Sequence, residues 1–333
     1  MKIIIPMAGI GKRMRPHTLT IPKPLIPVAG KPIVQHLVES LIKSFDTLPE
    51  EIAFVTGNFG EETEKKLLEI SHNLGIKGTI CYQHQALGTA HAILCANESL
   101  SGNVIVAFAD TLFKANFKID TQKDGIIWTS KVEDPSSFGV VTTDGNHKIT
   151  RFVEKPEDFV SNDAIIGIYY FKDGAYLRSE LQFLLDNCQM KSGEFQLTDA
   201  LENMMNKNIG FFTQQVEEWL DCGNKDATVH TNQRVLELLK DTELISAKAI
   251  IKNSIVKPPC YIGDNAVIED AVIGPHVSVG KNTHIHNSII TNSIIQDDSL
   301  INDANLDNSM IGSHVEYKGK FFELSIGDYT TLC

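Results

Sequence analysis

Short runs of apolar residues alternate with amphipathic segments along the first two-thirds of the chain. Continuous runs rich in Ile and Val predict buried strands at Lys2–Pro6, Ile52–Thr56, Val104–Ala109 and Ile126–Thr129. Between them, residues 32–45 place seven apolar side chains on one helical face, and residues 61–71 predict a second helix. This alternation predicts an α/β fold with a Rossmann-like, mainly parallel sheet that carries helices on both faces.

The pattern changes at about residue 250. From there, aliphatic residues recur at gaps of five or six, with small and polar residues between them. Neither a helix nor a simple alternating strand has this spacing, but a hexapeptide repeat does, with each aliphatic side chain pointing into a narrow parallel β-helix. The aliphatic positions are Ile251, Val256, Ile262, Ile268, Ile273, Val279, Ile285, Ile290, Ile295, Ile301, Leu306 and Ile311.

The two patterns together predict the domain organisation. A first domain covers residues 1–240, and its last part, residues 226–240, is a linker helix. The β-helix covers residues 250–318. The tail of residues 319–333 breaks the repeat, and we expect it to cap the open end of the β-helix. A chain of 333 residues is long enough to bury a core in each of the two domains.

Charge is distributed unevenly. The formal net charge is −12, yet residues 1–38 hold six Lys or Arg and no Asp or Glu, while the other 295 residues hold 24 bases and 42 acids. Nucleic-acid binding usually needs a broad basic face, so this balance argues against it. A compact basic segment in an acidic protein instead indicates a small polyanion, such as a polyphosphate.

Membrane and metal-cluster classes are disfavoured by the composition. No apolar run approaches the roughly 18 residues that a membrane-spanning helix needs. At the N-terminus a short apolar run precedes the basic cluster, which is the reverse of a secretory signal. The six cysteines lie far apart without a CxxC pair, which predicts neither zinc nor a disulfide framework and favours reduced thiols in a cytoplasmic protein.

A glycine- and base-rich loop directly follows the first predicted strand. Gly9 and Gly11 let backbone amides approach a phosphate chain, and Arg13 and Arg15 carry forked donors that suit phosphate oxygens. The loop is neither a Walker loop nor a dinucleotide fingerprint, because the Lys-Ser/Thr pair and the third glycine are absent. The loop alone therefore predicts an anion site. Downstream, three prolines surround Lys23, which favours a placed charge over a surface lysine.

Taken in order, these segments resemble the sugar nucleotidyltransferases, the family of glucose-1-phosphate thymidylyl- and uridylyltransferases. The family pattern G-G-x-G-T-R-L-x-P followed by P-K-P-L appears here as AGIGKRMRP and PKPL, with Ala8 and Lys12 departing from it. These matches follow the family order over about 220 residues, and together they are far more specific than any one of them. The later matching segments are QHQALGTA (83–90), Asp110, FGVV (138–141), EKP (154–156), AIIGIYY (164–170), GEFQLTD (193–199) and EWLDCG (218–223).

The resemblance implies a transfer of a nucleoside monophosphate from a triphosphate to a sugar 1-phosphate. It implies three catalytic residues: Arg13 stabilises the departing pyrophosphate, Lys23 the α-phosphate, and Lys155 the sugar phosphate. His17, His84 and His91 lie beside motifs, and we expect them to be neighbours rather than catalysts. The nucleotide-binding residues it implies are Ala8, Gly9, Gly11, Gln83, Gly88 and Thr89.

The resemblance also implies a metal site and a sugar site. Asp110 and Asp221 together hold Mg²⁺, an ion that prefers oxygen ligands. A helix cap is the alternative role for Asp110. The residues implied to bind the sugar phosphate are Gly139, Glu154, Lys155, Gly167, Tyr169 and Glu194.

The substrates remain open at this point. Gln83 with Gly88 and Thr89 fits thymine or uracil, so dTTP or UTP with glucose 1-phosphate is the favoured pair, with UDP-N-acetylglucosamine or GDP-mannose as alternative products. The β-helix resembles that of acyltransferases, which leaves a bifunctional enzyme with acetyltransferase activity open. We expect the β-helix to serve homo-oligomer assembly or regulation instead. A non-catalytic nucleotide-sugar sensor or scaffold subunit is the third alternative, and the presence of all the lysines and metal carboxylates argues against it.

Overall fold

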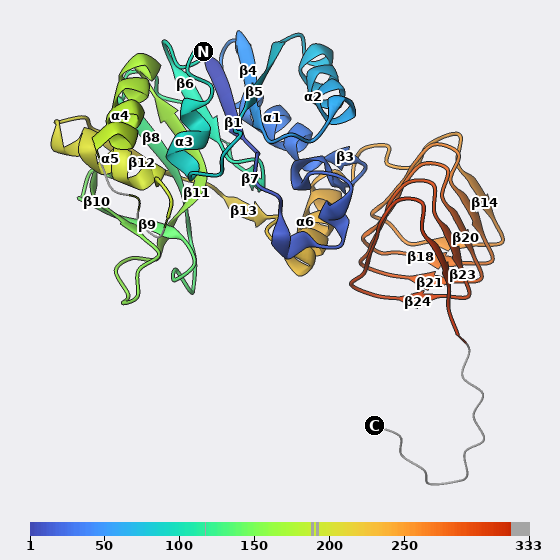
Figure 1. Cartoon of the computed structure of the whole chain (residues 1–333). Helices are drawn as coiled ribbons and strands as arrows, with labels where there is room; N and C mark the ends of the chain where they lie inside the picture. Colours follow the sequence, from blue (N-terminus) through green and yellow to red (C-terminus); the bar gives the residue numbers. More distant parts are fainter. Residues whose placement is uncertain (117, 188–189, 191–192, 321–333) are drawn as a thin grey trace. The chain divides into compact units, whose positions relative to one another are not determined.

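The computed structural model describes residues 1–116, 118–187, 190 and 193–320. Contacts divide the chain into two compact units (Figure 1). Unit 1 comprises Met1–Ile26 and Pro32–Gly223, and unit 2 comprises Pro27–Lys31 and the residues from Asn224 onward. Most of the predicted C-terminal tail, from residue 321, lies outside the described residues, so its predicted capping role stays a prediction.

Unit 1 is built on a nine-stranded sheet with the order β10-β9-β11-β6-β1-β4-β5, and β8 joins β11 to β12. The part β6-β1-β4-β5 is parallel, as the strand–helix alternation predicts. Strand β11 runs antiparallel to β6 and begins the antiparallel part. The strands are β1 (Lys2–Pro6), β4 (Glu51–Thr56), β5 (Lys77–Tyr82), β6 (Val104–Ala107), β8 (Gly125–Lys131), β9 (Gly139–Thr143), β10 (Ile149–Glu154), β11 (Asp163–Phe171) and β12 (Phe211–Gln215).

Helices cover both faces of this sheet. Apolar side chains of α3, α4 and α5 share one buried core with Ile4 and Val106 of the central strands. On the other face, α2 packs on β5, where a Cβ on Gly78 would collide with Ser71 Oγ of α2. The helices are α1 (Ile33–Lys43), α2 (Glu61–Asn73), α3 (Thr89–Leu94), α4 (Gly174–Asn187) and α5 (Leu197–Asn206), and the one-turn 3-10 helices are η1 (Lys12–Met14), η2 (His17–Leu19) and η3 (Lys23–Leu25).

A small antiparallel pair lies beside this sheet. Strand β7 (Thr111–Lys114) pairs with β13 (Glu218–Asp221), so that Asp221 is opposite Thr111. The backbone N–H of Cys222 donates to the carbonyl of Asp110 at 3.0 Å, which extends the ladder by one step. Two aspartates that are about one hundred positions apart in the sequence therefore become neighbours through backbone pairing.

Unit 2 forms a short left-handed parallel β-helix, preceded by helix α6 (Lys225–Leu238). Helix α6 covers most of the residues predicted as a linker helix at the end of the first domain, 226–240, and its contacts group it with unit 2. The three stacks are β14 (Ile250–Lys252), β17 (Val267–Glu269), β20 (His284–His286), β23 (Leu300–Asn302) and β26 (Glu316–Lys318); β15 (Ile255–Val256), β18 (Val272–Ile273), β21 (Ile289–Ile290) and β24 (Asn305–Leu306); and β16 (Cys260–Ile262), β19 (Val277–Val279), β22 (Ile294–Ile295) and β25 (Met310–Ile311).

The register of the stacks explains the repeat. Ile268 lies over Ile285, and Ile285 over Ile301, so aliphatic positions one coil apart stack directly on each other. These three side chains are at most 1% exposed. Ile251 differs from the prediction of an inward side chain because it is 39% exposed. It lies in the first coil, where a neighbouring coil covers only one side.

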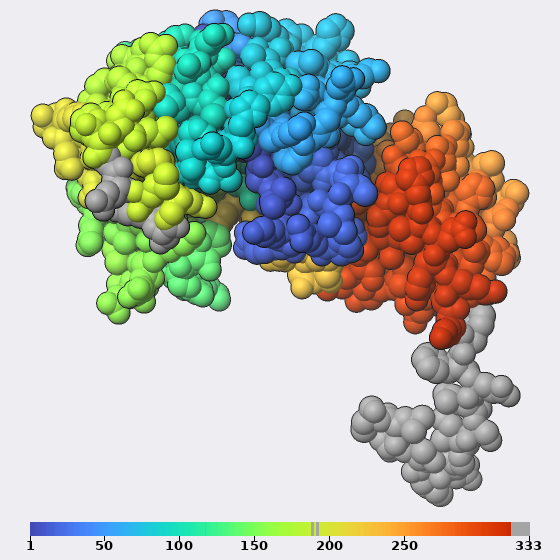
Figure 2. Space-filling view, in the orientation of Figure 1, coloured from blue at the N-terminus to red at the C-terminus, as the bar shows by residue number. Residues whose placement is uncertain are grey.

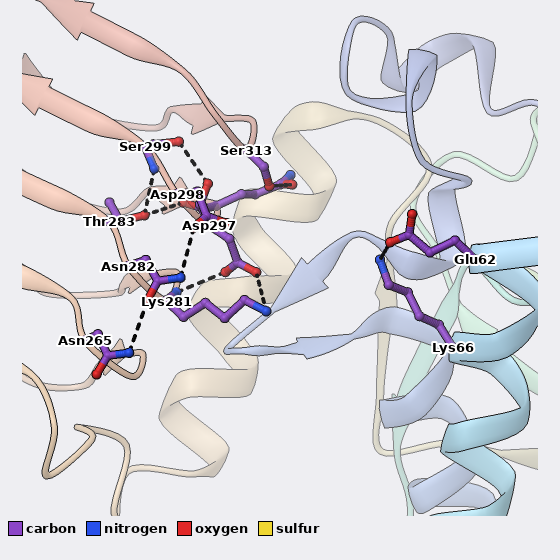
Figure 3. Close-up of polar contacts among 11 residues, drawn as sticks. Glu62, Lys66, Asn265, Lys281, Asn282, Thr283, Asp297, Asp298, Ser299 and Ser313 are labelled. Carbon is purple, nitrogen blue, oxygen red and sulfur yellow. Dashed lines mark hydrogen bonds and ion pairs between the residues drawn. The ribbon is translucent and has the colours of Figure 1, made fainter.

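Asn and Asp residues make the corners of the β-helix. Asn265, Asn282 and Asp298 have φ values of 57°, 54° and 55°, in the left-handed region that Asn and Asp tolerate better than most residues. Asn265 Nδ2 donates to Asn282 Oδ1 at 3.2 Å, and Asn282 Nδ2 donates to Asp298 Oδ1 at 2.9 Å. Figure 3 shows this ladder running from coil to coil. Each corner therefore supports the next through side-chain amides.

A buried asparagine ties the segment Pro27–Lys31 to the rest of unit 2. Asn232 of α6 is fully buried, and its Oδ1 accepts from the Ala29 N–H at 2.9 Å and from Ser278 Oγ at 2.6 Å. Its Nδ2 donates to the carbonyl of His276 at 3.3 Å. We call these three bonds the Asn232 clamp. The segment itself is a turn between β2 (Pro27–Val28) and β3 (Lys31–Pro32).

Candidate active site

A cavity of about 290 Å³ opens in unit 1 beside the carboxyl end of β1. Figure 2 shows this face of unit 1 hollowed between the dark-blue residues near the N-terminus and the green to yellow-green residues. Ligands in open α/β sheets bind at this end of the strands. Nine of the predicted site residues line the cavity: Ala8, Gly9, Gly11, Lys23, Gln83, Gly88, Thr89, Asp110 and Glu194.

The N-terminal loop leaves β1 at Pro6 and is fixed mainly through Gly11. Gly11 has φ of 57°, its carbonyl accepts from Thr18 Oγ1 at 2.9 Å, and a Cβ there would lie 3.2 Å from the Cβ of Lys23. A Cβ on Gly9 would meet nothing within 4 Å. Packing therefore demands glycine at position 11, whereas Gly9 leaves open space that a ligand can enter.

Lys23 is held by an ion pair inside this site. Its Nζ lies 2.6 Å from Asp110 Oδ2, and the lysine side chain is only 12% exposed. The 3-10 turn η3, with Pro22 before it and Pro24 within it, fixes the backbone from which Lys23 projects. The ammonium group of Lys23 is thus held in one position within the site and is largely shielded from solvent.

Asp221, the last residue of β13, lies close to the charges of Asp110, Lys23 and Arg13. Burial raises the pKa of the Asp221 carboxyl, and the neighbouring charge of Asp110 raises it further. A hydrogen bond from the Gly223 backbone and the charges of Lys23 and Arg13 act in the opposite direction but do not reverse the shift. Two carboxylates are therefore held together at a cost that a bound cation would relieve.

The donor set around these carboxylates suits a hard cation. Among the residues that the structure describes, no group of three or more His, Cys, Asp or Glu side chains is arranged to hold a metal. Asp110 and Asp221 can therefore supply two oxygen ligands, and phosphate oxygens and water would have to complete the shell. Mg²⁺ commonly binds in this way, through one or two carboxylates plus substrate phosphates.

Gln83 follows β5 and lies in the cavity wall. Its Nε2 donates to the carbonyl of Gly88 at 3.2 Å and lies 3.0 Å from Nδ1 of His91. Gly88 has φ of 106°, and a Cβ there would lie 2.5 Å from the backbone oxygen of Phe195. Gly88 is therefore required by its positive φ and by the close approach of the backbone of Phe195.

Except for Glu194, which lines the cavity, the predicted sugar residues lie on or directly after β9, β10 and β11. Glu154 ends β10 opposite Gly139 of β9, and a Cβ on Gly139 would lie 3.1 Å from Glu154 Oε2. Thr198 Oγ1 donates to the same oxygen at 3.4 Å. Lys155 follows with φ of 43° and places Nζ 3.9 Å from Glu154 Oε1. Glu154 is thus the centre of this group, although it does not line the 290 Å³ cavity.

Gly167 and Tyr169 lie on β11, next to Phe108 of the cavity wall. A Cβ on Gly167 would lie 3.2 Å from the Phe108 ring, and the rings of Phe108 and Tyr169 meet edge to face at 6.2 Å. Burial, and then the charge of Glu154, raise the pKa of Tyr169, so its hydroxyl stays protonated. Phe108 therefore connects the wall of the cavity to the predicted sugar residues.

The structure adds residues that sequence reasoning missed. Phe108 lines the cavity, and Thr198 bonds to Glu154, yet neither was predicted as a site residue. Position offered a signal for both: Phe108 stands two residues before Asp110, and Thr198 belongs to the GEFQLTD segment. Arg13, Gly139, Glu154, Lys155, Gly167, Tyr169 and Asp221 lie outside the cavity lining.

The histidines of the β-helix occupy corners and strands. His276 and His314 have φ of 62° and 57°, as expected for corner positions, while His284 and His286 lie on strand β20. His276 Nε2 lies 2.6 Å from Glu237 Oε1 of α6. This pairing gives His276 a structural contact within unit 2.

Comparison with known proteins gives two family matches. Residues 2–237 match the nucleotidyl transferase family, and residues 230–292 match the family described as GlmU-like, C-terminal hexapeptide. No helix in the described ranges is both long and apolar enough to cross a membrane.

Individual relatives cover different shares of the chain. The low-salt glycan biosynthesis nucleotidyltransferase Agl11 of Haloferax volcanii is 30% identical over 265 residues, 77% of this chain and 72% of its own. The mannose-1-phosphate guanylyltransferase catalytic subunit beta of Danio rerio is 36% identical over 192 residues, 55% of this chain and 52% of its own. A structure of UDP-glucose pyrophosphorylase complexed with UDP-glucose aligns with a TM-score of 0.58 and 26% identity, over 71% of this chain and 98% of that one.

Proposed function

Because the chain belongs to the nucleotidyl transferase family, we propose that it transfers a nucleoside monophosphate from a triphosphate to a sugar 1-phosphate at the cavity of unit 1. The observation that carries the proposal is the ion pair of Lys23 with Asp110 in the lining of that cavity, with the carboxyl of Asp221 close enough to feel both charges. Nucleotidyl transfer is the activity for which the family and the Haloferax volcanii relative are named, and the name of the Danio rerio relative adds a sugar 1-phosphate as the acceptor.

In the proposed reaction, an oxygen of the sugar phosphate attacks the α-phosphorus of the triphosphate. The new P–O bond forms as the bond from the α-phosphorus to the bridging oxygen breaks, and pyrophosphate leaves in line. A phosphate monoester is already ionised near neutral pH, so no general base is needed. The protein therefore acts mainly by positioning and by charge neutralisation.

Each cation of the site has a separate role in this proposal. Lys23, placed by η3, donates to the α-phosphate, and Arg13 of η1 neutralises the departing pyrophosphate. Lys155, next to Glu154, binds the incoming sugar phosphate. Asp110 and Asp221 would hold a magnesium ion, which when bound supplies further neutralisation of phosphate charge. Lys23 would exchange its contact with Asp110 for one with the nucleotide.

The proposed base is one that carries an imino N–H. With Nε2 of Gln83 directed to Gly88 and His91, the carbonyl oxygen Oε1 is the amide atom that can face a base. This acceptor matches N3–H of uracil and thymine, and also N1–H of guanine, whereas cytosine and adenine have a lone pair at that position.

We propose dTTP or UTP with glucose 1-phosphate as the substrates, a choice supported by the fold shared with UDP-glucose pyrophosphorylase. GTP with mannose 1-phosphate is the second candidate, supported by the name of the Danio rerio relative. Glu154, Thr198 and Tyr169 would contact the sugar hydroxyls. The cytoplasmic location and the assembly through the β-helix remain proposals.

A substrate matrix tests this proposal. Five triphosphates are combined with the 1-phosphates of glucose, mannose, galactose and N-acetylglucosamine, and pyrophosphate release is measured with Mg²⁺ and with EDTA. We expect turnover with one uracil, thymine or guanine nucleotide and its loss in EDTA. Absence of turnover in every combination would favour the sensor or scaffold alternative. Acetyl-coenzyme A consumption with an amino sugar phosphate, measured in parallel, tests the bifunctional alternative.

A further inference from the structure

The orientation of the Gln83 side chain is determined by its two neighbours. A backbone carbonyl can only accept a hydrogen bond, so the amide atom that lies 3.2 Å from the carbonyl of Gly88 must be the nitrogen Nε2. The same nitrogen lies 3.0 Å from Nδ1 of His91. Since an amide nitrogen only donates, Nδ1 must accept, and His91 must be neutral with its proton on Nε2.

The surroundings of His91 favour the neutral form of its imidazole. His91 lies on helix α3, and burial lowers the pKa of its imidazole. A hydrogen bond with the Gln85 backbone raises this pKa, but by less than burial lowers it. Its Nε2 lies 3.9 Å from Sγ of Cys95, one turn further along. Burial raises the pKa of the Cys95 thiol, so the sulfur stays protonated and is a weak polar neighbour rather than a thiolate that would favour an imidazolium.

A protonated or flipped His91 would present an N–H to Gln83. The amide would then face a conflict, because rotating Oε1 toward His91 also brings it against the carbonyl oxygen of Gly88. The neutral imidazole avoids this conflict and makes both contacts of Nε2 favourable. His91 and Gly88 therefore act together in directing Oε1 away from themselves.

We propose that His91 is a positioning residue that sets the amide orientation of Gln83 and thereby restricts the nucleotide to bases with an imino N–H. The inference rests on the proposed function, since it assumes that the base occupies the cavity beside Gln83. His91 itself does not touch the base in this account. It acts through Gln83, and so its effect is on the choice of base and not on phosphoryl transfer.

Two substitutions separate positioning from packing. His91→Asn keeps an acceptor near the place of Nδ1, whereas His91→Leu has a similar bulk without any acceptor. The readouts are kcat and KM with UTP and CTP, and with GTP and ATP, for the wild type and both variants. Calorimetric binding of the same four nucleotides gives the same comparison without turnover.

We expect the wild type to prefer the imino-bearing base of each pair by about 10- to 100-fold, the range that one unpaired buried polar contact costs. His91→Asn should retain most of this preference. His91→Leu should lower it by about 5- to 10-fold, through KM rather than kcat, because Gly88 still holds one amide hydrogen. Equal base preference in the two variants would overturn the inference.

The tautomer can be observed directly. Long-range ¹H–¹⁵N spectra of the labelled full-length protein at neutral pH should show His91 with its proton on Nε2, and a proton on Nδ1 would contradict the inference. Failure of the proposed function would give a different result, because then neither the wild type nor the two variants would release pyrophosphate from any nucleotide. In that case the binding preference and the tautomer would still decide the role of His91.

Discussion

The two units of this chain use their sequences in different ways. In unit 2 each coil repeats the preceding one, so that Ile268, Ile285 and Ile301 form one column and their neighbours form others. In unit 1 the candidate site unites segments from residue 8 to residue 221, none of which repeats another. The comparison teaches that a regular pattern can determine a shape on its own, whereas a site depends on which distant segments the fold brings together.

The largest effect should come from Lys23→Ala. Removing one charge contact to a transferring phosphoryl group commonly costs about 100-fold or more in turnover, and we expect at least that loss in pyrophosphate release. The fold should remain, because the pair with Asp110 lies at the edge of a cavity and not in a core. Lys65→Ala is the matched control, since Lys65 makes an exposed ion pair with Glu69 on α2. Near-wild-type turnover of Lys23→Ala would remove Lys23 from the mechanism.

Asp221→Asn should separate activity from stability within unit 1. We expect turnover to fall about 100-fold as well, while the thermal midpoint rises, because the variant removes a buried charge that faces Asp110. The folded-state pKa of Asp221 is raised, so this carboxyl costs stability increasingly as the pH rises through its titration range. The gap in midpoint between variant and wild type should therefore widen from acidic to neutral pH in metal-free buffer. A lower midpoint for the variant at neutral pH would contradict this account.

In unit 2, Ile285→Ala should lower the stability of the protein and leave its turnover unchanged. Truncating a fully buried isoleucine typically costs about 2–5 kcal/mol, and the vacant position would interrupt a column in the middle of the β-helix. Denaturant unfolding followed by circular dichroism measures the loss, and kcat with saturating substrates should stay close to that of the wild type. Ile285→Val, expected to cost about 0.5–1.5 kcal/mol, provides the graded control. A large fall in kcat at full folding would show that the two units are less independent than their patterns imply.

Asn232→Ala should have a smaller effect on stability. It leaves the Ala29 N–H and the Ser278 hydroxyl without their acceptor in a buried place, at about 1–3 kcal/mol for an unsatisfied buried group. Ser278→Ala removes a single bond of the clamp and should cost less. Unfolding free energies of the two variants test the order, and an equal loss in both would mean that the Ala29 contact contributes little.

Much of the fold could be predicted from the sequence, and for a physical reason. The strands at Lys2–Pro6 and Ile52–Thr56 are continuous apolar runs because they are buried on both faces, and the structure confirms them as β1 and most of β4. The hexapeptide spacing could be predicted for a similar reason, because aliphatic side chains of successive coils stack on one another inside the β-helix. The antiparallel pairing of β11 with β6 could not be predicted, because the direction in which two strands pair does not affect the local pattern of hydrophobic residues.

The site was predictable only in part. Resemblance pointed to Asp110 and Asp221, and the β7–β13 pairing gives a geometric reason for their meeting that spacing alone could not supply. The contacts of Gln83 with Gly88 and His91 depend on side-chain orientation, which no one-dimensional pattern encodes. Thr198 was overlooked for the same reason, because its relation to Glu154 exists only after β10 and α5 have packed.

The short turn at Pro27–Lys31 has a consequence for how the chain can be recombined. It follows Lys23 by only a few residues, yet its contacts belong to unit 2, where the ring of Tyr261 fills the space beside Gly30 that a Cβ would overlap. A chimera that joins residues 1–223 to a foreign β-helix would therefore keep the turn Pro27–Lys31 but lose the β-helix residues, such as Tyr261, that pack against it. Exchange of the two halves, in the laboratory or in evolution, has to carry this five-residue insert along with the C-terminal module.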